Sequence, residues 1–182
     1  METKAWIAFF SQTGSEIADI AHKLGVWPDV IVTNERPEHL RTIDPRIEEH
    51  GYFTWANRPE EEDYIALLEK YPHAIVTLHG WLRVLPASVC ERSEIYNGHP
   101  GLITRFPELK GKDPQVRAYE GKYPSIGCVI HKVTAGVDEG EVLMEDRVTA
   151  SGLELDDIFR ILKDRSYRLW CIFLKKVLWS KE

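Results

Sequence analysis

Short apolar runs that alternate with segments of helical periodicity constrain the fold of this chain more than any other feature. Lys4–Phe10 is apolar and aromatic, as expected for a buried strand, and apolar residues between Ile17 and Leu24 then recur at helical spacing. A second apolar run, His73–His79, follows a helix-like segment that opens after Pro59. Because strands that alternate with helices build βαβ units, we expect an α/β fold around a mostly parallel sheet.

The last third of the chain departs from this alternation. Two strand-like segments, Ser125–Thr134 and Glu141–Val148, are separated by a short loop, which predicts an antiparallel hairpin appended to the parallel sheet. A long helix over Asp156–Leu178 carries an apolar stripe that should pack on the core. Since no repeat or linker interrupts the pattern, we expect a single domain over residues 1–182.

Composition and charge argue against several classes of protein. The chain has 182 residues, of which 43% are hydrophobic, and its net charge of −6 disfavours general nucleic-acid binding. Its three cysteines form no CxxC pair or Cys/His cluster, which disfavours a metal site and indicates a reducing compartment. Without a signal peptide or an apolar run of membrane length, the chain is expected to be cytoplasmic and to have no membrane partner.

The stretch Ile95–Leu102 contains the strongest chemical signal. Asn97 and His99 lie two residues apart in an extended segment, so their side chains should point to the same side. Histidine exchanges a proton near neutral pH, and asparagine can donate a hydrogen bond to a developing oxyanion. Pro100 and Gly101 should end the strand directly behind them. The pair is therefore a candidate catalytic centre on the loop that follows the strand.

The loop Thr134–Gly140 supplies a carboxylate, Asp138, on a turn that its two glycines permit. An aspartate beside a histidine favours the charged imidazolium and orients the ring. An amide, an imidazole and a carboxylate together suit acyl or formyl transfer by direct attack of an amine, since no serine or cysteine nucleophile adjoins the histidine. From spacing alone, Asp138 could equally be an ordinary loop aspartate.

An anion site is a third candidate. Ser11–Ser15 joins a strand to a helix, where backbone N–H groups and the helix dipole favour a phosphate, although its hydroxyls could simply cap the helix. Arg58 is a further anion ligand or else an exposed surface arginine. Ligands of parallel sheets bind outside the carboxyl ends of the strands, which places this loop, Gly80–Leu85 and Asn97–His99 at one edge. His79, at a strand end, is more typical of a structural histidine.

Together these motifs resemble the folate-dependent formyltransferases, in particular those that act on glycinamide ribonucleotide. The resemblance rests first on Asn97–Pro100 and on Gly127–Thr134 with the following Val137–Gly140 loop. The segment Leu78–Leu85 is similar to the family pattern Leu-Ala-Gly-Phe-Met-Arg-Ile-Leu. The segment Ser11–Ser15 is similar to the Ser-Gly-Asn-Gly-Ser phosphate loop of the family. No single motif is specific, but their combination is, and it extends to the region of Asp157.

The resemblance implies a Rossmann-like domain with helices on both faces of the sheet, 10-formyltetrahydrofolate as co-substrate and a small amine as acceptor. The implied catalytic set is Asn97, His99 and Asp138. The implied folate-binding residues are Arg83, Val84, Leu85, Thr134, Val137 and Gly140. The implied contacts of an acceptor phosphate are Thr13, Gly14, Ser15 and Arg58. A monomer or homodimer without a metal is expected, in purine biosynthesis if the acceptor is glycinamide ribonucleotide.

Four residues depart from the family pattern and leave alternatives open: Gln12, Gly101, Thr104 and Glu108. They cluster on the acceptor side, so a sugar-nucleotide amine is an alternative acceptor. A formyltetrahydrofolate hydrolase would share the catalytic set but usually carries an extra domain ahead of it. From another class, the segment Phe10–Glu16 also resembles the phosphate loop of flavodoxins, which are flavin-binding electron carriers, although no later segment resembles their flavin loops.

Overall fold

One seven-stranded sheet organises the part of the chain that this computed structural model describes, residues 4–34 and 42–180. The strands are β1 (Trp6–Phe10), β2 (Val30–Thr33), β3 (Phe53–Thr54), β4 (Ile75–His79), β5 (Glu94–His99), β6 (Ser125–Lys132) and β7 (Val142–Thr149). Their order across the sheet is β3-β2-β1-β4-β5-β6-β7. The first five strands pair in parallel, whereas β6 runs antiparallel to both of its neighbours. The predicted parallel sheet with an antiparallel C-terminal hairpin is confirmed.

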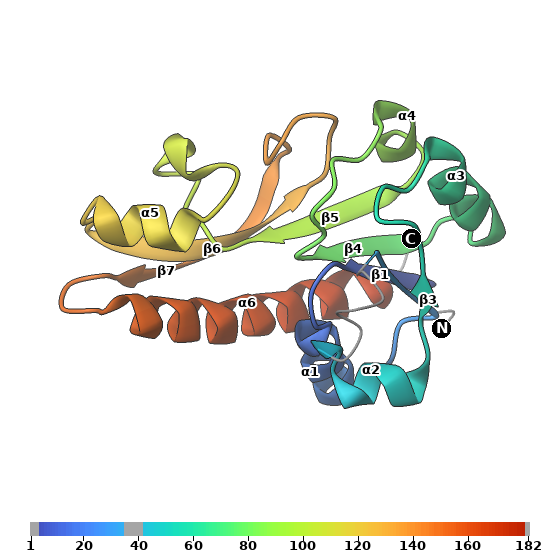
Figure 1. The fold of residues 1–182 in the computed structure, drawn as a ribbon, viewed down its shortest axis with the longest axis horizontal. Helices are drawn as coiled ribbons and strands as arrows, with labels where there is room; N and C mark the ends of the chain where they lie inside the picture. The colour runs from blue at the N-terminus through green and yellow to red at the C-terminus, as the bar shows by residue number, and fades with distance from the viewer. Residues whose placement is uncertain (1–3, 35–41, 181–182) are drawn as a thin grey trace.

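Helices cover both faces of this sheet, as expected (Figure 1). The helices are α1 (Ser15–Leu24), α2 (Pro45–His50), α3 (Glu61–Lys70), α4 (Ala87–Cys90), α5 (Pro114–Glu120) and α6 (Leu155–Leu178), with a short 3-10 turn at Pro107–Leu109. In Figure 1, α1, α2 and α6 lie below the sheet, and α3, α4 and α5 lie above it. A Rossmann-like arrangement of layers results.

Local sequence signals account for where the principal helices begin and end. Helix α1 stops at Gly25, which adopts a left-handed conformation with φ of 69° that glycine accepts without steric cost. Helices α3 and α6 each begin with a capping box, formed by Glu60 with Asp63 and by Glu154 with Asp157. The acidic cluster at the start of α3 is therefore a helix start rather than a metal site.

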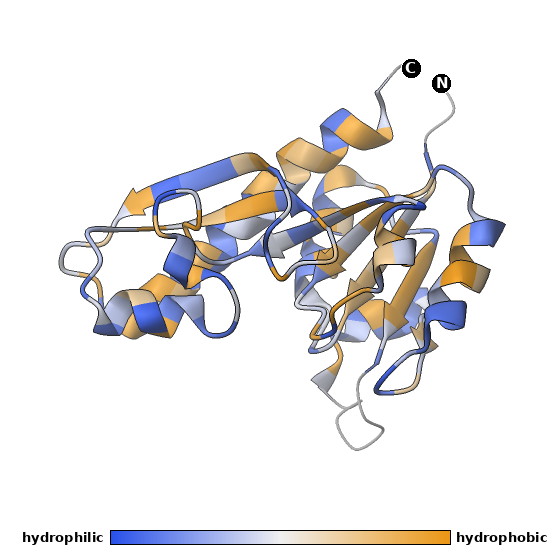
Figure 2. Cartoon of the chain, turned by 90° about the horizontal axis from the view of Figure 1, so that it is seen from above, coloured by the Kyte–Doolittle hydropathy of each residue, from blue (hydrophilic) through white to orange (hydrophobic). Residues whose placement is uncertain are grey.

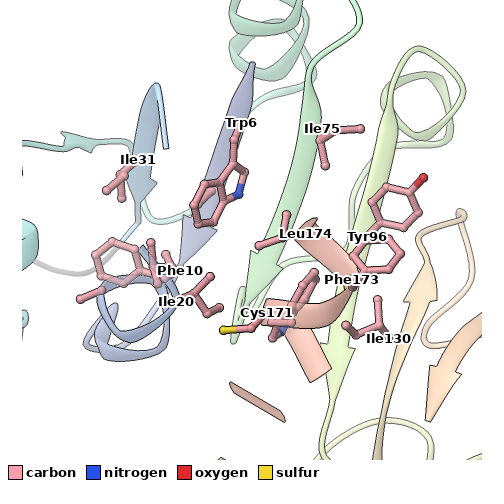
Figure 3. Packing of buried hydrophobic residues seen from close by; sticks show 14 of the residues in the cluster. Trp6, Phe10, Ile20, Ile31, Ile75, Tyr96, Ile130, Cys171, Phe173 and Leu174 are labelled. Atoms are coloured by element: carbon pink, nitrogen blue, oxygen red, sulfur yellow. The ribbon is translucent and has the colours of Figure 1, made fainter. Parts of the chain in front are cut away.

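The core consists of two main layers, one on each face of the sheet. Strands β1, β2 and β4 are buried along their whole length, and Figure 2 shows the central strands as predominantly hydrophobic. On the face covered by α1 and α6, Trp6 and Ile75 pack near Phe173 and Leu174 of α6 (Figure 3). On the opposite face, Ile7, Phe9 and other strand residues pack against α3 and α4. Strand β7 instead alternates between half-buried and exposed residues, as an edge strand with one solvated face does.

One strand boundary differs from the expectation in a way that matters for function. Asn97 and His99 lie within β5 rather than on the loop behind it. The reason is the antiparallel neighbour, because β6 pairs with Tyr96 to His99 and extends the ladder to the end of the motif. The two side chains are therefore held by a sheet on both sides. Helix α4 and the 3-10 turn were not predicted.

Two further observations concern membrane spans and cysteine thiols. Within the described ranges, no helix combines the length and apolar character that a membrane span requires. Cys90, Cys128 and Cys171 are all buried and unpaired with one another.

Candidate functional site

Three elements bring four polar side chains together at the end of β5. Asn97 and His99 project from the same face of β5, and His131 lies opposite Asn97 on β6. Asp138, from the loop between β6 and β7, inserts between the two imidazoles. Its Oδ2 lies 3.3 Å from Nδ1 of His99, and its Oδ1 lies 3.3 Å from Nε2 of His131. The Asn97 amide nitrogen lies 3.5 Å from the same Oδ1 and 3.2 Å from Nε2 of His131. We call these four residues the polar cluster.

The loop that carries Asp138 folds back tightly onto β6. Asp138 has a positive φ of 53°, a conformation that aspartate tolerates better than most residues. A Cβ atom added to Gly140 would lie 1.6 Å from the Lys132 carbonyl oxygen, so only glycine allows this close approach. The return of the chain against Lys132 is what turns the Asp138 carboxylate toward β5.

A second loop reaches the polar cluster with its backbone alone. The Leu109 carbonyl oxygen lies 2.9 Å from Nε2 of His99, and the Gly111 N–H donates to Oδ2 of Asp138 over 2.8 Å. Arg117 of α5 holds this loop by donating to the carbonyl oxygens of Glu108, Leu109 and Lys110. The residues Pro107–Gly111 therefore clamp His99 and Asp138 from the side opposite the sheet, and we call them the clamp loop.

Gly101 makes room for the His99 ring and for Pro114, the first residue of α5. A Cβ atom added to Gly101 would lie 2.8 Å from Nε2 of His99 and 2.9 Å from Cβ of Pro114. Gly101, which differs from the family pattern, is thus the residue that allows His99 and Pro114 to approach the backbone closely here. Two other departures also form contacts in this region: Thr104 donates to Glu145 over 2.5 Å, and Glu108 accepts from Tyr123 over 2.7 Å.

The hydrogen-bond partners indicate where the ring protons lie. Nε2 of His99 faces a carbonyl oxygen, as does Nδ1 of His131, which lies 2.9 Å from the Lys132 oxygen. A carbonyl only accepts, so each of these nitrogens carries a proton. In neutral rings the remaining nitrogens, both facing Asp138, would then be bare. The lone pairs of these ring nitrogens would then repel those of the Asp138 carboxylate. A proton bound between the carboxylate and either ring would form a hydrogen bond in place of this repulsion, so the polar cluster is arranged to take up a proton.

Burial and neighbouring charges shift the pKa values of two groups in the cluster. Burial lowers the pKa of His99 below the ordinary value of 6.5, and the Asp138 charge only partly offsets this. Burial raises the pKa of Asp138, but contacts with a protonated His131 or His99 and the hydrogen bond from the Gly111 N–H outweigh it, so the pKa of this carboxyl lies below its ordinary value. Asp138 thus favours the charged imidazolium, as expected, but desolvation of the ring outweighs this attraction, and the pKa of His99 lies below its ordinary value.

The polar cluster forms one end of a cleft of about 830 Å³. Four apolar side chains on the rim of this cleft are strongly exposed: Leu82 (62%), Val84 (64%), Val137 (52%) and Phe159 (43%). Surface apolar residues gathered around a cavity are typical of a ligand site. The cleft therefore combines an apolar rim with a polar, proton-binding end.

The sequence-predicted residues fall into two groups. The cleft is lined by Asn97, His99 and Asp138 and by Arg83, Val84, Leu85, Thr134 and Val137. Gly140 lies outside this lining, and its role is to let the loop pass close to the Lys132 carbonyl oxygen. The guanidinium of Arg83 is turned onto Asn57, to whose carbonyl oxygen it donates over 2.6 Å.

The predicted acceptor residues Thr13, Gly14, Ser15 and Arg58 also lie outside the lining of the cleft. Gly14 is the N-cap of α1 with φ of 71°, and the Thr13 hydroxyl accepts from the Ser15 N–H over 3.2 Å, so part of the capping alternative is realised. The loop nevertheless adjoins the cleft. The Ser11 hydroxyl accepts from the Leu82 N–H over 2.9 Å, and Gln12 is part of the lining. Arg58 is exposed.

Sequence reasoning missed His131 and the clamp loop. His131 interrupts an otherwise apolar strand on the face that carries Val129 and Val133, and that irregularity was the available signal. The clamp loop acts through a carbonyl and an N–H group, for which no side chain gives a signal. Among the described residues, no group of three or more His, Cys, Asp or Glu is arranged to hold a metal ion.

The chain is similar to known proteins over most of its length. Residues 28–160 match the formyl transferase family. The chain is 33% identical over 107 residues to a formyltetrahydrofolate deformylase from Synechocystis sp., which covers 58% of this chain and 37% of that protein. It is 30% identical over 109 residues to the human trifunctional purine biosynthetic protein adenosine-3, covering 58% of this chain and 10% of that one. The chain thus spans less than half the length of these curated relatives.

Solved structures share the fold. The crystal structure of phosphoribosylglycinamide formyltransferase from Bacillus halodurans superimposes with a TM-score of 0.81 at 22% identity, over 98% of this chain and 97% of that one. At this identity the similarity concerns the fold alone. It matches the mostly parallel sheet with its antiparallel C-terminal strands.

Proposed function

The chain belongs to the formyl transferase family, and we propose that it is an enzyme that moves a formyl group from 10-formyltetrahydrofolate to a small amine. The observation that carries this proposal is the polar cluster in the lining of an apolar-rimmed cleft: a carboxylate with two imidazoles and an amide within 3.5 Å of its oxygens. The flavodoxin alternative gains no support from the family match.

The proposed reaction is direct attack without a covalent enzyme intermediate. The acceptor nitrogen attacks the formyl carbon, and the carbonyl electrons move to its oxygen, to which the Asn97 amide donates a hydrogen bond. The proton released by the attacking nitrogen passes to the polar cluster, where His99 and Asp138 present acceptor atoms. As the tetrahedral intermediate collapses, the bond from carbon to N10 of the folate breaks and N10 takes up that proton. The products are a formamide and tetrahydrofolate.

The rim of the cleft suits the folate. A pterin ring is flat and largely apolar on its faces, so it would cover the exposed side chains of Leu82, Val84 and Val137. Its polar edge requires hydrogen bonds, which backbone groups of Arg83 to Leu85 and of Thr134 and Val137 would supply. Because the Arg83 guanidinium contacts Asn57, we assign Arg83 a backbone role at this site.

We propose that the binding site of the acceptor adjoins the cleft at Gln12, which is part of the cleft lining. The N-terminus of α1, with Thr13, Gly14 and Ser15, favours an anionic group on the acceptor, and Arg58 adds a positive charge. Glycinamide ribonucleotide is the candidate acceptor, since it carries both a phosphate and a primary amine. A sugar-nucleotide amine also has both features.

Hydrolysis is the second candidate function. The observation that favours it is the 33% identity to a formyltetrahydrofolate deformylase. The same polar cluster would activate water as it activates an amine, so the chemistry of the cluster suits both reactions.

A direct assay distinguishes these functions. The protein is incubated with 10-formyltetrahydrofolate and, in separate reactions, with glycinamide ribonucleotide, with sugar-nucleotide amines and without any amine. Tetrahydrofolate, formamide product and free formate are all measured. We expect amine-dependent formylation that is lost in His99→Ala. Formate release at the same rate without an amine would assign the hydrolase, and no consumption of 10-formyltetrahydrofolate in any reaction would contradict both.

We further propose that the chain acts as one domain, in the cytoplasm, as a monomer or homodimer. The match to the family over residues 28–160 and the single sheet support one domain. Free thiols at all three cysteines suit a reducing compartment.

A further inference from the structure

A second polar network lies on the opposite face of the sheet from the polar cluster. His79 ends β4, and its Nδ1 lies 2.8 Å from Oε1 of Glu16 on α1. The Ser166 hydroxyl of α6 donates to the other oxygen of Glu16 over 2.8 Å. Nε2 of His79 lies 2.8 Å from the Thr77 hydroxyl. The side chain of His79 is only 2% exposed, so this network belongs to the core rather than to the surface.

The network has a single consistent direction of hydrogen bonds. The Trp6 indole N–H donates to the Thr77 hydroxyl over 2.8 Å, which leaves the hydroxyl proton free for Nε2 of His79. Nδ1 of His79 then donates to the Glu16 carboxylate, which only accepts. Each hydrogen bond of the network then has one donor and one acceptor. Because a satisfied buried polar network permits few other arrangements, it holds the His79 ring in one position.

The His79 ring in turn packs against Trp170 of α6, which lies beneath the candidate catalytic strand. The two ring centroids are 4.7 Å apart. Trp170 is fully buried, and among the described residues its indole nitrogen has no hydrogen-bond partner, an unfavourable arrangement that packing must enforce. A Cβ atom added to Gly98 would lie only 2.7 Å from that nitrogen. The indole thus forms the surface on which Gly98 rests.

Gly98 is the residue between Asn97 and His99. Strand register places it beside the end of β4, because Leu78 pairs with Asn97 and the next residues along the two strands are His79 and Gly98. Alternation then points the two candidate catalytic side chains to one face and leaves Gly98 against Trp170 on the other. A shift of the indole toward or away from the sheet would move both side chains relative to Asp138.

We propose that His79 and Glu16 are positioning residues for catalysis: through Trp170 they set the position of Gly98, and thereby the geometry of Asn97 and His99. This inference rests on the proposed catalytic role of those two side chains. Displacements of about 1 Å at a reacting centre reduce rates by roughly a hundredfold, so a small change beneath Gly98 has a large kinetic effect.

The test compares three variants with the wild type, using 10-formyltetrahydrofolate and glycinamide ribonucleotide. His79→Leu keeps an apolar side chain beside Trp170 but removes both hydrogen bonds. His79→Asn retains a donor near the position of Nδ1. Leu162→Ala is the matched control, since Leu162 is a buried residue of α6 that packs in a different core cluster. Melting temperatures are measured for all of them.

We expect His79→Leu to lose about tenfold or more in kcat with the KM for folate changed less than twofold, and His79→Asn to recover part of the loss. Leu162→Ala should lose stability but keep kcat. Unchanged kcat in a folded His79→Leu, or an equal loss in Leu162→Ala, would overturn the proposal. Glu16→Gln is the variant to use if His79→Leu does not fold, and it should also lower kcat. A raised KM for the acceptor at unchanged kcat would overturn the positioning role and assign Glu16 to acceptor binding.

A spectroscopic measurement separates this proposal from the proposed function. In protein labelled with ¹⁵N-histidine, the ring signals of His99 are assigned with His99→Gln. We expect these signals to shift in His79→Leu and to stay in place in Leu162→Ala, whatever the acceptor is. If His99→Ala retains full turnover, the catalytic assignment fails. If His99→Ala is inactive while His79→Leu leaves both the His99 signals and the rate unchanged, the positioning role fails.

Discussion

At the scale of single residues, one carboxylate contacts most of the groups in the candidate site. Asp138 contacts His99 and His131 with its two oxygens, lies within reach of the Asn97 amide and accepts from the Gly111 N–H. The same carboxylate therefore contacts both rings, and in the proposed reaction it takes part in proton uptake. Removing its charge while keeping its size is the most informative single change.

Asp138→Asn should lower kcat by about 10²-fold or more while the KM for 10-formyltetrahydrofolate stays near that of the wild type. The reason is that the amide cannot accept and pass on the proton, whereas contacts of the folate with the rim remain. Steady-state kinetics with varied folate measure both constants. Asp113→Asn is a matched control, since Asp113 also lines the cleft and also has a φ of 53°. A kcat for Asp138→Asn within threefold of the wild type would contradict the role of this carboxylate.

At the scale of elements, the site depends on a strap between α5 and the clamp loop. Arg117 donates to three consecutive carbonyl oxygens, and one of them, that of Leu109, is also the partner of His99. Helix α5 thus anchors a loop that has no regular structure beyond one 3-10 turn. The geometry around His99 is set by this anchor as well as by the sheet.

Arg117→Ala should free the clamp loop, lower kcat about tenfold and reduce the free energy of unfolding by about 1–3 kcal/mol, the range for lost hydrogen bonds from a charged group. Activity assays and urea denaturation measure the two effects. Glu120→Ala, an exposed position on the same helix, should change neither. Full activity in Arg117→Ala would show that the clamp loop does not need this strap.

At the scale of the whole molecule, the buried site makes stability depend on pH. Burial lowers the pKa of His99 below 6.5, so below that pH the unfolded chain binds more protons than the folded one. The contribution of His99 to stability is therefore present above pH 6.5 and is lost as the pH falls below it. The pKa of Asp138 lies below 3.8, so a further loss follows in more acidic solution.

The free energy of unfolding of the wild type should therefore fall between pH 7.5 and pH 5.5, and it should fall less in His99→Gln, which has no titrating ring at this position. Urea denaturation at the two pH values measures the difference. His22→Gln removes an exposed histidine and should behave as the wild type does. An equal loss in His99→Gln and the wild type would contradict the buried, proton-poor state of His99.

Much of the architecture could be predicted from the sequence because it follows from local periodicity. The apolar runs of β1 and β4, the glycine that ends α1 and the acidic starts of α3 and α6 are each determined by residues close together in the chain. The spacing of Asn97 and His99 likewise determines that both point to one face. The resemblance to a family of known fold added the helices on both faces and the importance of Asp138.

The remaining features of the site could not be predicted, because they depend on contacts between distant segments of the chain. His131 meets Asn97 because β6 pairs antiparallel with β5, and Leu109 meets His99 through a backbone atom that no sequence pattern marks. The lowered pKa of His99 follows from its burial, which opposes the effect of the Asp138 charge that proximity alone predicts. The spacing in the sequence thus determined that Asn97 and His99 point to one face of the strand. Their charge, partners and support beneath Gly98 were decided by packing, because desolvation and close contact exist only in the folded chain.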